Sequence, residues 1–123
     1  MNKKDLTKRT GYGTSTKDII WHPKALDEIK CFPKDAKIKI GFQLRTLQQG
    51  RIIEMPHSKP MNTIASGVYE LRVKVKDGIY RVFYYVKVAD GIYVFHAFQK
   101  KTQKTPLAEI KIAQKRLKEL MEN

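Results

Sequence analysis

Arginine and lysine residues alternate with apolar residues in the second half of the chain, where they could bind a phosphodiester. Arg72 and Lys74 lie in one such run, and Arg81 follows the turn-forming pair at residues 77–78. Alternate residues of a strand share one face, and antiparallel pairing across this turn brings Arg72 close to Arg81. Two cations this close repel each other, so a bound anion is an economical explanation. The arginine fork also matches the oxygens of a phosphate.

Aromatic and further basic residues extend this predicted cationic face. Phe83, Tyr85 and Lys87 alternate with Arg81 along the same run, and aromatic rings among cations suit unstacked nucleobases. We therefore expect Tyr85 and Lys87 to contact RNA. For Lys87, an ordinary solvated face is the competing interpretation.

A second basic run lies directly before the last predicted helix. It contains Lys100, Lys101 and Lys104, and the free N–H groups of a helix N-terminus favour anions. The run and the helix could therefore bind the same phosphate. A solvated loop is an equally good interpretation of these lysines.

Two residues are candidates for acid–base chemistry. Glu70 is the only carboxylate within the predicted hairpin strands, where it either pairs with an arginine or serves as a base. His96 lies in mid-strand, and a lone histidine there is more often a satisfied core residue. No glycine-rich phosphate loop, serine nucleophile motif or paired carboxylates are present. With one cysteine and no cluster at ligand spacing, we predict no metal site and no cofactor.

The charge balance predicts a polyanionic or acidic partner. Lys and Arg number 25 against 12 Asp and Glu, which gives a formal net charge of +13. Nucleic acid, an acidic membrane surface and an acidic protein all fit this excess. No apolar run is long enough to span a bilayer, and the N-terminus does not look like a secretory signal. A cytoplasmic setting without membrane contact is therefore expected.

The spacing of apolar residues predicts an α+β domain with an antiparallel sheet, an N-terminal helical hairpin and a C-terminal helix. Two Asp-Gly pairs, at 77–78 and 90–91, indicate hairpin turns. Thr105 is the expected N-cap of the last helix, with Pro106 as its first residue. Residues 1–16 read as a flexible basic arm and residues 17–123 as one domain. The predicted ranges are 18–21 for a first strand, 23–30 and 33–47 for the helices, 54–66 for a loop, 68–76, 79–88 and 92–98 for the sheet, and 106–121 for the last helix.

Several runs together resemble a known family. They are Val-Tyr-Glu-Leu-Arg at 68–72, Tyr-Arg-Val-Phe-Tyr at 80–84 and Phe-His-Ala-Phe-Gln-Lys-Lys-Thr-Gln-Lys-Thr-Pro at 95–106, followed by Glu-Ile at 109–110 and Ala-x-x-Arg at 113–116. In these the chain resembles the phage Gp49-like, HigB-type branch of the RelE/ParE toxin superfamily. The likeness covers residues 18–120 in the order of elements.

The resemblance implies a RelE-like (microbial RNase-like) fold and the toxin of a type II toxin–antitoxin system. Such toxins enter the ribosomal A site and cut mRNA without a metal, through attack by the substrate's own 2′-OH. An endoribonuclease (mRNA interferase) is thus the implied activity. The implied catalytic positions are Arg72, Lys74, Arg81 and Lys101, with Lys74 or Lys101 as the base. The C-terminal tyrosine of RelE-like toxins has no counterpart here.

The resemblance also implies a partner and leaves alternatives. The partner would be a cognate antitoxin, by family habit a helix-turn-helix protein of the HigA type. One alternative function is a ParE-like poison of DNA gyrase on the same fold. Another is a basic RNA-binding module without catalytic activity.

Overall fold

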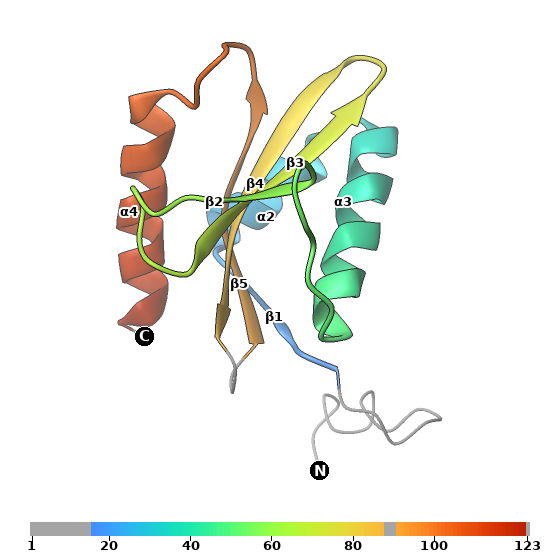
Figure 1. The fold of residues 1–123 in the computed structure, drawn as a ribbon. Helices are drawn as coiled ribbons and strands as arrows, with labels where there is room; N and C mark the ends of the chain where they lie inside the picture. The colour runs from blue at the N-terminus through green and yellow to red at the C-terminus, as the bar shows by residue number, and fades with distance from the viewer. Residues whose placement is uncertain (1–15, 88–90, 123) are drawn as a thin grey trace.

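A five-stranded mixed sheet forms the centre of the computed structural model, which describes residues 16–87 and 91–122 (Figure 1). The strand order is β1-β5-β4-β3-β2. The α+β class is confirmed, but β1 runs parallel to β5, so the sheet is not entirely antiparallel as predicted. The elements are β1 Ile19–Trp21, α2 Pro23–Lys30, α3 Lys34–Gln48, β2 Ser58–Pro60, β3 Val68–Val75, β4 Gly78–Lys87, β5 Gly91–Lys100 and α4 Leu107–Met121.

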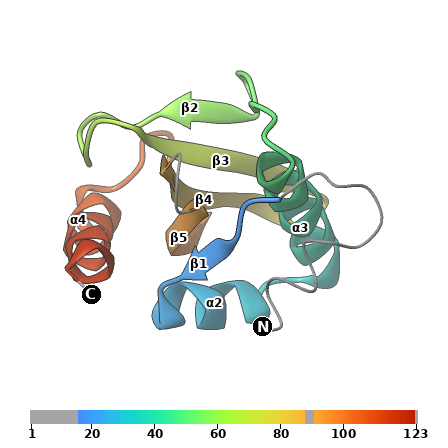
Figure 2. The same ribbon diagram turned by 90° about the horizontal axis from the view of Figure 1, so that it is seen from below.

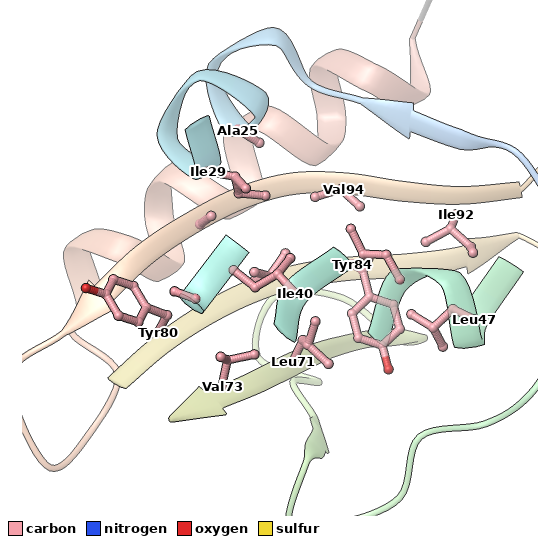
Figure 3. Close-up of a cluster of buried hydrophobic side chains, with 14 of the residues drawn as sticks. Ala25, Ile29, Ile40, Leu47, Leu71, Val73, Tyr80, Tyr84, Ile92 and Val94 are labelled. Atoms are coloured by element: carbon pink, nitrogen blue, oxygen red, sulfur yellow. The ribbon is translucent and has the colours of Figure 1, made fainter. Parts of the chain in front are cut away.

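The two predicted N-terminal helices are present as α2 and α3, and both pack on one face of the sheet. Their apolar residues recur every three or four positions, so one side of each helix is buried. Ile40 and Leu47 of α3 lie in one cluster with Leu71 and Tyr84 of the strands (Figure 3). Gly50 follows the end of α3 with φ +84°, a conformation that glycine adopts without strain.

Helix α4 covers part of the opposite face and builds a second core (Figure 2). Ala113 and Leu117 of the helix pack with Val68, Phe83 and Phe95 of the strands. Phe83 is fully buried, so our expectation that it lies on an exposed cationic face was wrong. The sheet is therefore buried on both faces where α4 packs on it.

Strand β2 lies within residues 54–66, which the sequence predicted to be a loop. It has only three residues and pairs antiparallel with β3, with Lys59 opposite Glu70. Pro60 is tolerated because β2 is an edge strand of the sheet. A strand this short, ending in proline, carries no periodic signal that sequence reasoning could use.

The edge of β5 is completed by side chains beyond the point where β1 stops. β1 pairs with β5 only as far as Val94. Beyond it, the Ala97 N–H donates to Glu28 Oε1 at 3.1 Å, and Arg116 Nη1 lies 3.4 Å from the Phe95 carbonyl oxygen. Glu28 of α2 and Arg116 of α4 thus bind backbone groups that a longer β1 would have bound.

Two expectations lie wholly or partly outside the described residues. The basic arm predicted over residues 1–16 is described only at Thr16, and Asp90 of the second turn is not described. The first hairpin is confirmed, but its turn lies at residues 76–77, one residue earlier than predicted, because Val75 pairs with Gly78. Within residues 16–87 and 91–122, no helix is long and apolar enough to cross a membrane.

Gly91 provides a test of how β1 is attached to the sheet. Its φ is +130°, and a Cβ there would lie 2.4 Å from the backbone oxygen of Asp18. We expect Gly91→Ala to lower the free energy of unfolding by about 2 kcal/mol or more, because backbone strain and a clash add. Gly41, in α3, has open space around it. Gly41→Ala should therefore raise stability by up to about 1 kcal/mol in the same urea denaturation experiment. Equal stability of Gly91→Ala and the wild type would contradict this account.

Candidate functional site

Arg72 and Arg81 occupy directly opposite positions on β3 and β4, closer than the prediction that they share one face of the hairpin required. The Glu70 carboxylate lies between them. Its Oε1 is 3.3 Å from Arg81 Nε and 3.5 Å from Arg72 Nε. A single buried carboxylate therefore offsets the repulsion between two neighbouring guanidinium groups.

The second oxygen of Glu70 fixes the segment that leads into α4. Thr105 Oγ1 donates a hydrogen bond of 2.7 Å to Glu70 Oε2. Thr105 is therefore not the N-cap that the sequence predicted. Pro106 takes the N-cap position, and its carbonyl accepts from the N–H groups of Glu109 and Ile110. The loop before α4 is thereby attached to the arginine pair.

The arginine pair is largely removed from water and incompletely paired. Arg81 is 6% exposed and Glu70 is 2% exposed. The Nε atoms of Arg72 and Arg81 are buried without a well-aligned hydrogen bond, although both lie within ion-pair distance of Glu70. Burial lowers the pKa of Arg81, Glu70 opposes this, and Arg72 lowers it further. Arg72, whose side chain is 28% exposed, is the member of the pair that a further anion could reach.

A hollow of about 510 Å³ opens beside Glu70 and Arg72 on the α4 side of the sheet. Four of its lining residues are cations and one is a carboxylate, so positive charge is in excess by three. The lining residues are Lys59, Pro60, Met61, Asn62, Thr63, Glu70, Arg72, Lys100, Gln103, Lys104, Thr105 and Ile110. A hollow of this charge and size can accept a phosphate group of a larger ligand.

Lys100 is the lysine at this site with a lowered pKa. Burial is the largest cause and lowers the pKa of Lys100. The positive charges of Arg81, Arg72 and Lys59 lower this pKa further, while Glu70 raises it. Its ammonium group also donates to the Gln103 carbonyl oxygen. A lysine that loses its proton more readily than usual can accept a proton from a hydroxyl group.

The other predicted basic residues are divided among different places. Lys104 lines the hollow with Lys100. Lys101 is exposed just after the end of β5 and is not among the lining residues. Lys74 is exposed opposite Ile79 and lines a separate groove beside α3. Of the four predicted catalytic residues, the structure therefore brings Arg72 and Arg81 together at Glu70.

Tyr85 and Lys87 lie farther along β4 from the arginine pair. Strand geometry places them roughly 13 and 20 Å from Arg81. Tyr85 packs against the second core, with its ring edge-on to Tyr93 at 6.2 Å between centroids. Lys87 is exposed at the end of the strand, opposite Gly91. The structure does not bring them into the hollow with Arg72.

His96 is a buried residue with partners at both ring nitrogens. Nε2 lies 2.6 Å from Glu109 Oε1. Nδ1 lies 3.0 Å from Arg116 Nη1 and 3.4 Å from Glu28 Oε1. The ring is 2% exposed and stacks on Phe98. His96 therefore ties α2, β5 and α4 together, and it is not placed to exchange a proton with a substrate in the hollow.

Sequence reasoning missed two residues of the site, Lys59 and Thr105. Lys59 lies in the short strand that was predicted to be a loop. Thr105 was assigned to a helix cap because Thr-Pro is a common helix start. Thr105 directly follows the basic run that contains Lys104, whereas no comparable signal surrounds Lys59 in the sequence. Among the described residues, no three His, Cys, Asp or Glu side chains form a group that could hold a metal ion.

The fold and the hollow define a basic α+β protein with a cationic hollow on the α4 side of its sheet. A family model described as phage derived protein Gp49-like (DUF891) matches residues 27–118, about three quarters of the chain. The chain belongs to this family. The match includes the arginine pair, Lys100 and Thr105. No curated protein matches the chain.

The Glu28 cluster predicts a specific acid sensitivity. Burial would raise the pKa of Glu28, but His96, Arg116 and the Ala97 N–H lower it from 4.5 to about 2. A lowered folded-state pKa stabilises the protein above pH 4.5, and this contribution is lost as the pH falls toward 2. Glu28→Gln should therefore be less stable at pH 7 and lose less stability between pH 4.5 and 2. Urea denaturation across this range measures both. A constant difference between the two proteins would contradict the assignment.

Proposed function

We propose that this chain is the toxin of a type II toxin–antitoxin pair, of the HigB-type branch of the RelE/ParE superfamily, and that it cuts mRNA without a metal. The observation that carries the proposal is the ion-paired group of Arg72, Arg81 and Glu70, of which Arg72 and Glu70 line a cationic hollow. The sequence motifs given above and membership of the Gp49-like family support it.

The proposed chemistry is transfer of the phosphate to the neighbouring 2′-OH. Neutral Lys100 accepts the 2′-OH proton as O2′ attacks phosphorus, and the bond from phosphorus to O5′ breaks. The products are a 2′,3′-cyclic phosphate and a 5′-hydroxyl end, and a protonated group supplies the proton to O5′. Lys104, which lines the same hollow, is our candidate for this acid. Arg72 and Arg81 stabilise the charge that builds up on the phosphate oxygens.

Two observations change which lysine we propose as the base: the pKa of Lys100 is lowered, and Lys101 does not line the hollow. We assign the base to Lys100, because its pKa is lowered by burial and by the neighbouring cations. Lys101 and Lys74 then assist in binding the RNA backbone. Glu70 acts as a positioning residue for the two arginines, because both of its oxygens are engaged.

The proposed setting is the cytoplasmic ribosome. RNA threaded into the A site would reach an open hollow on the sheet, and the net charge of +13 would favour contact with ribosomal RNA. We propose a helix-turn-helix antitoxin of the HigA type as the partner that neutralises the toxin. Residue-specific predictions on cleavage follow from this assignment.

Removal of Arg72 should abolish cleavage while leaving the fold intact. Its side chain is 28% exposed, in contrast to the buried Arg81. We expect Arg72→Ala to lower the cleavage rate by about 100-fold or more, because one phosphate-stabilising cation is lost. Primer extension on cellular mRNA after induction measures this. Arg45→Ala, which removes an exposed arginine of α3, is the matched control and should cut like the wild type.

The same induction experiment separates the alternatives. mRNA cleavage that requires translation and disappears in Arg72→Ala supports the proposal. Intact mRNA with double-strand breaks in DNA would instead identify a gyrase poison. RNA binding without toxicity or cleavage would identify a non-catalytic RNA-binding module.

The role of Lys100 as base can be separated from its charge. Lys100→Arg keeps a cation but cannot release its proton at neutral pH. We expect cleavage by this variant to fall by about 100-fold or more, while its affinity for an RNA oligonucleotide stays within about threefold of the wild type. Fluorescence anisotropy measures the affinity, and single-turnover cleavage on programmed ribosomes measures the rate. Cleavage at the wild-type rate would exclude Lys100 as the base.

A further inference from the structure

Helix α3 exposes two large apolar side chains that neither core uses. Ile38 is 61% exposed and Phe42 is 72% exposed. They are four residues apart, so they lie roughly 6 Å apart along the same side of the helix. Single exposed apolar residues are common, but two on the same side of a helix can mark a surface that contacts a partner.

A groove of about 500 Å³ lies beside this pair and is lined by residues of α3 and β3. It combines apolar side chains with positive charge, and no carboxylate lines it. Its lining residues are Ile38, Lys39, Phe42, Gln43, His57, Arg72, Val73 and Lys74. The three cations Lys39, Arg72 and Lys74 lie together without acidic neighbours in the lining. Such a surface is complementary to a ligand that is both apolar and acidic.

The edge of β3 argues for a helix as the ligand and against an added strand. β2 covers the edge through the pairing of Ser58 with Leu71, and the Arg72 N–H donates to the His57 carbonyl. Beyond them, Lys39 Nζ donates to the Lys74 carbonyl at 2.9 Å. A new strand would have to displace this bond, whereas a helix lying along α3 would leave it intact.

We propose that the groove between α3 and β3 binds an amphipathic helix of a protein partner, with apolar residues facing Ile38 and Phe42 and carboxylates facing the three cations. Apolar side chains one turn apart on the partner match the interval between Ile38 and Phe42. A second copy of this chain is disfavoured because it carries the same formal charge of +13. RNA would satisfy the cations but leave the two apolar side chains without a partner.

Arg72 connects this groove to the candidate functional site. It lines both the groove and the hollow beside Glu70. Carboxylates of the bound helix that pair with Arg72 would draw it away from a phosphate in the hollow. This regulatory consequence rests on the proposed function, whereas helix binding itself does not.

A synthetic peptide tests the binding. The probe is a helical peptide with leucines along one face and glutamates elsewhere, labelled for fluorescence anisotropy. We expect Phe42→Ser to weaken its binding by about tenfold or more, because the contact of the ring with the peptide is lost. Leu107→Ser is the matched control, since Leu107 is 64% exposed at the start of α4, and it should bind like the wild type. Circular dichroism verifies that both variants are folded.

Charge-reversing substitutions test whether the cations of the groove pair with carboxylates of the partner helix. Lys39→Glu should weaken binding of the same peptide by about tenfold or more, while Lys118→Glu, an equal charge change at an exposed position of α4, should weaken it by less than threefold. A peptide with glutamine in place of glutamate should bind less tightly than the probe. RNA oligonucleotides should bind Phe42→Ser as well as the wild type.

Several results would overturn the proposal. They are absence of peptide binding, equal binding by Phe42→Ser and Leu107→Ser, and equal weakening by both charge changes. Self-association that Phe42→Ser abolishes would assign the groove to a second copy. These assays use purified protein without ribosomes, so failure of the RNase proposal leaves their outcome unaffected. Conversely, cleavage that the bound peptide does not inhibit would refute only the connection through Arg72.

Discussion

The structure around the candidate site depends on one electrostatic constraint, the placement of two guanidinium groups opposite each other on neighbouring strands. Such a pair repels, and burial of Arg81 increases the cost. The Glu70 carboxylate reduces this cost because one of its oxygens serves both arginines. Its other oxygen accepts from Thr105 and holds the loop that carries Lys104. The charge compensation of the arginines and the shape of the hollow therefore have the same origin.

The two cores determine which part of the sheet can take part in function. α2 and α3 bury one face, and α4 buries part of the other. Phe83 and Phe95 are enclosed under α4, whereas Arg72 and Lys100 lie beyond its reach and border the hollow. The cluster of partly buried Glu28, Glu109 and Arg116 around buried His96 fixes α4 to β5 and α2. It thereby sets where the helix begins and how much of the sheet stays open.

Local patterns predicted most elements but not which face each side chain occupies. The helical spacing predicted α2, α3 and α4 correctly, and the first Asp-Gly pair predicted the hairpin of β3 and β4. The exact pairing could not be predicted from it, because the turn lies one residue earlier, at 76–77, and this shift places Arg72 opposite Arg81. The alternation rule failed at Phe83, because a strand covered on both faces places apolar residues on both. Lys59 and Thr105 could not be predicted, since their roles depend on contacts with Glu70 and the hollow that are distant in sequence.

A β-bulge in the pairing of β4 with β5 changes which residues of β5 face each core. Phe83 faces His96, whereas Tyr84 faces Val94, so Phe95 is an extra residue on β5. Before this bulge, the even-numbered Ile92 and Val94 belong to the first core. After it, the even-numbered Phe98 belongs to the second core, and Lys100 borders the hollow. Because Phe95 is the extra residue, its deletion would close the bulge and leave the residues before and after it on their present faces. What the deletion would remove is one of the two phenylalanine rings that β5 contributes to the second core under α4.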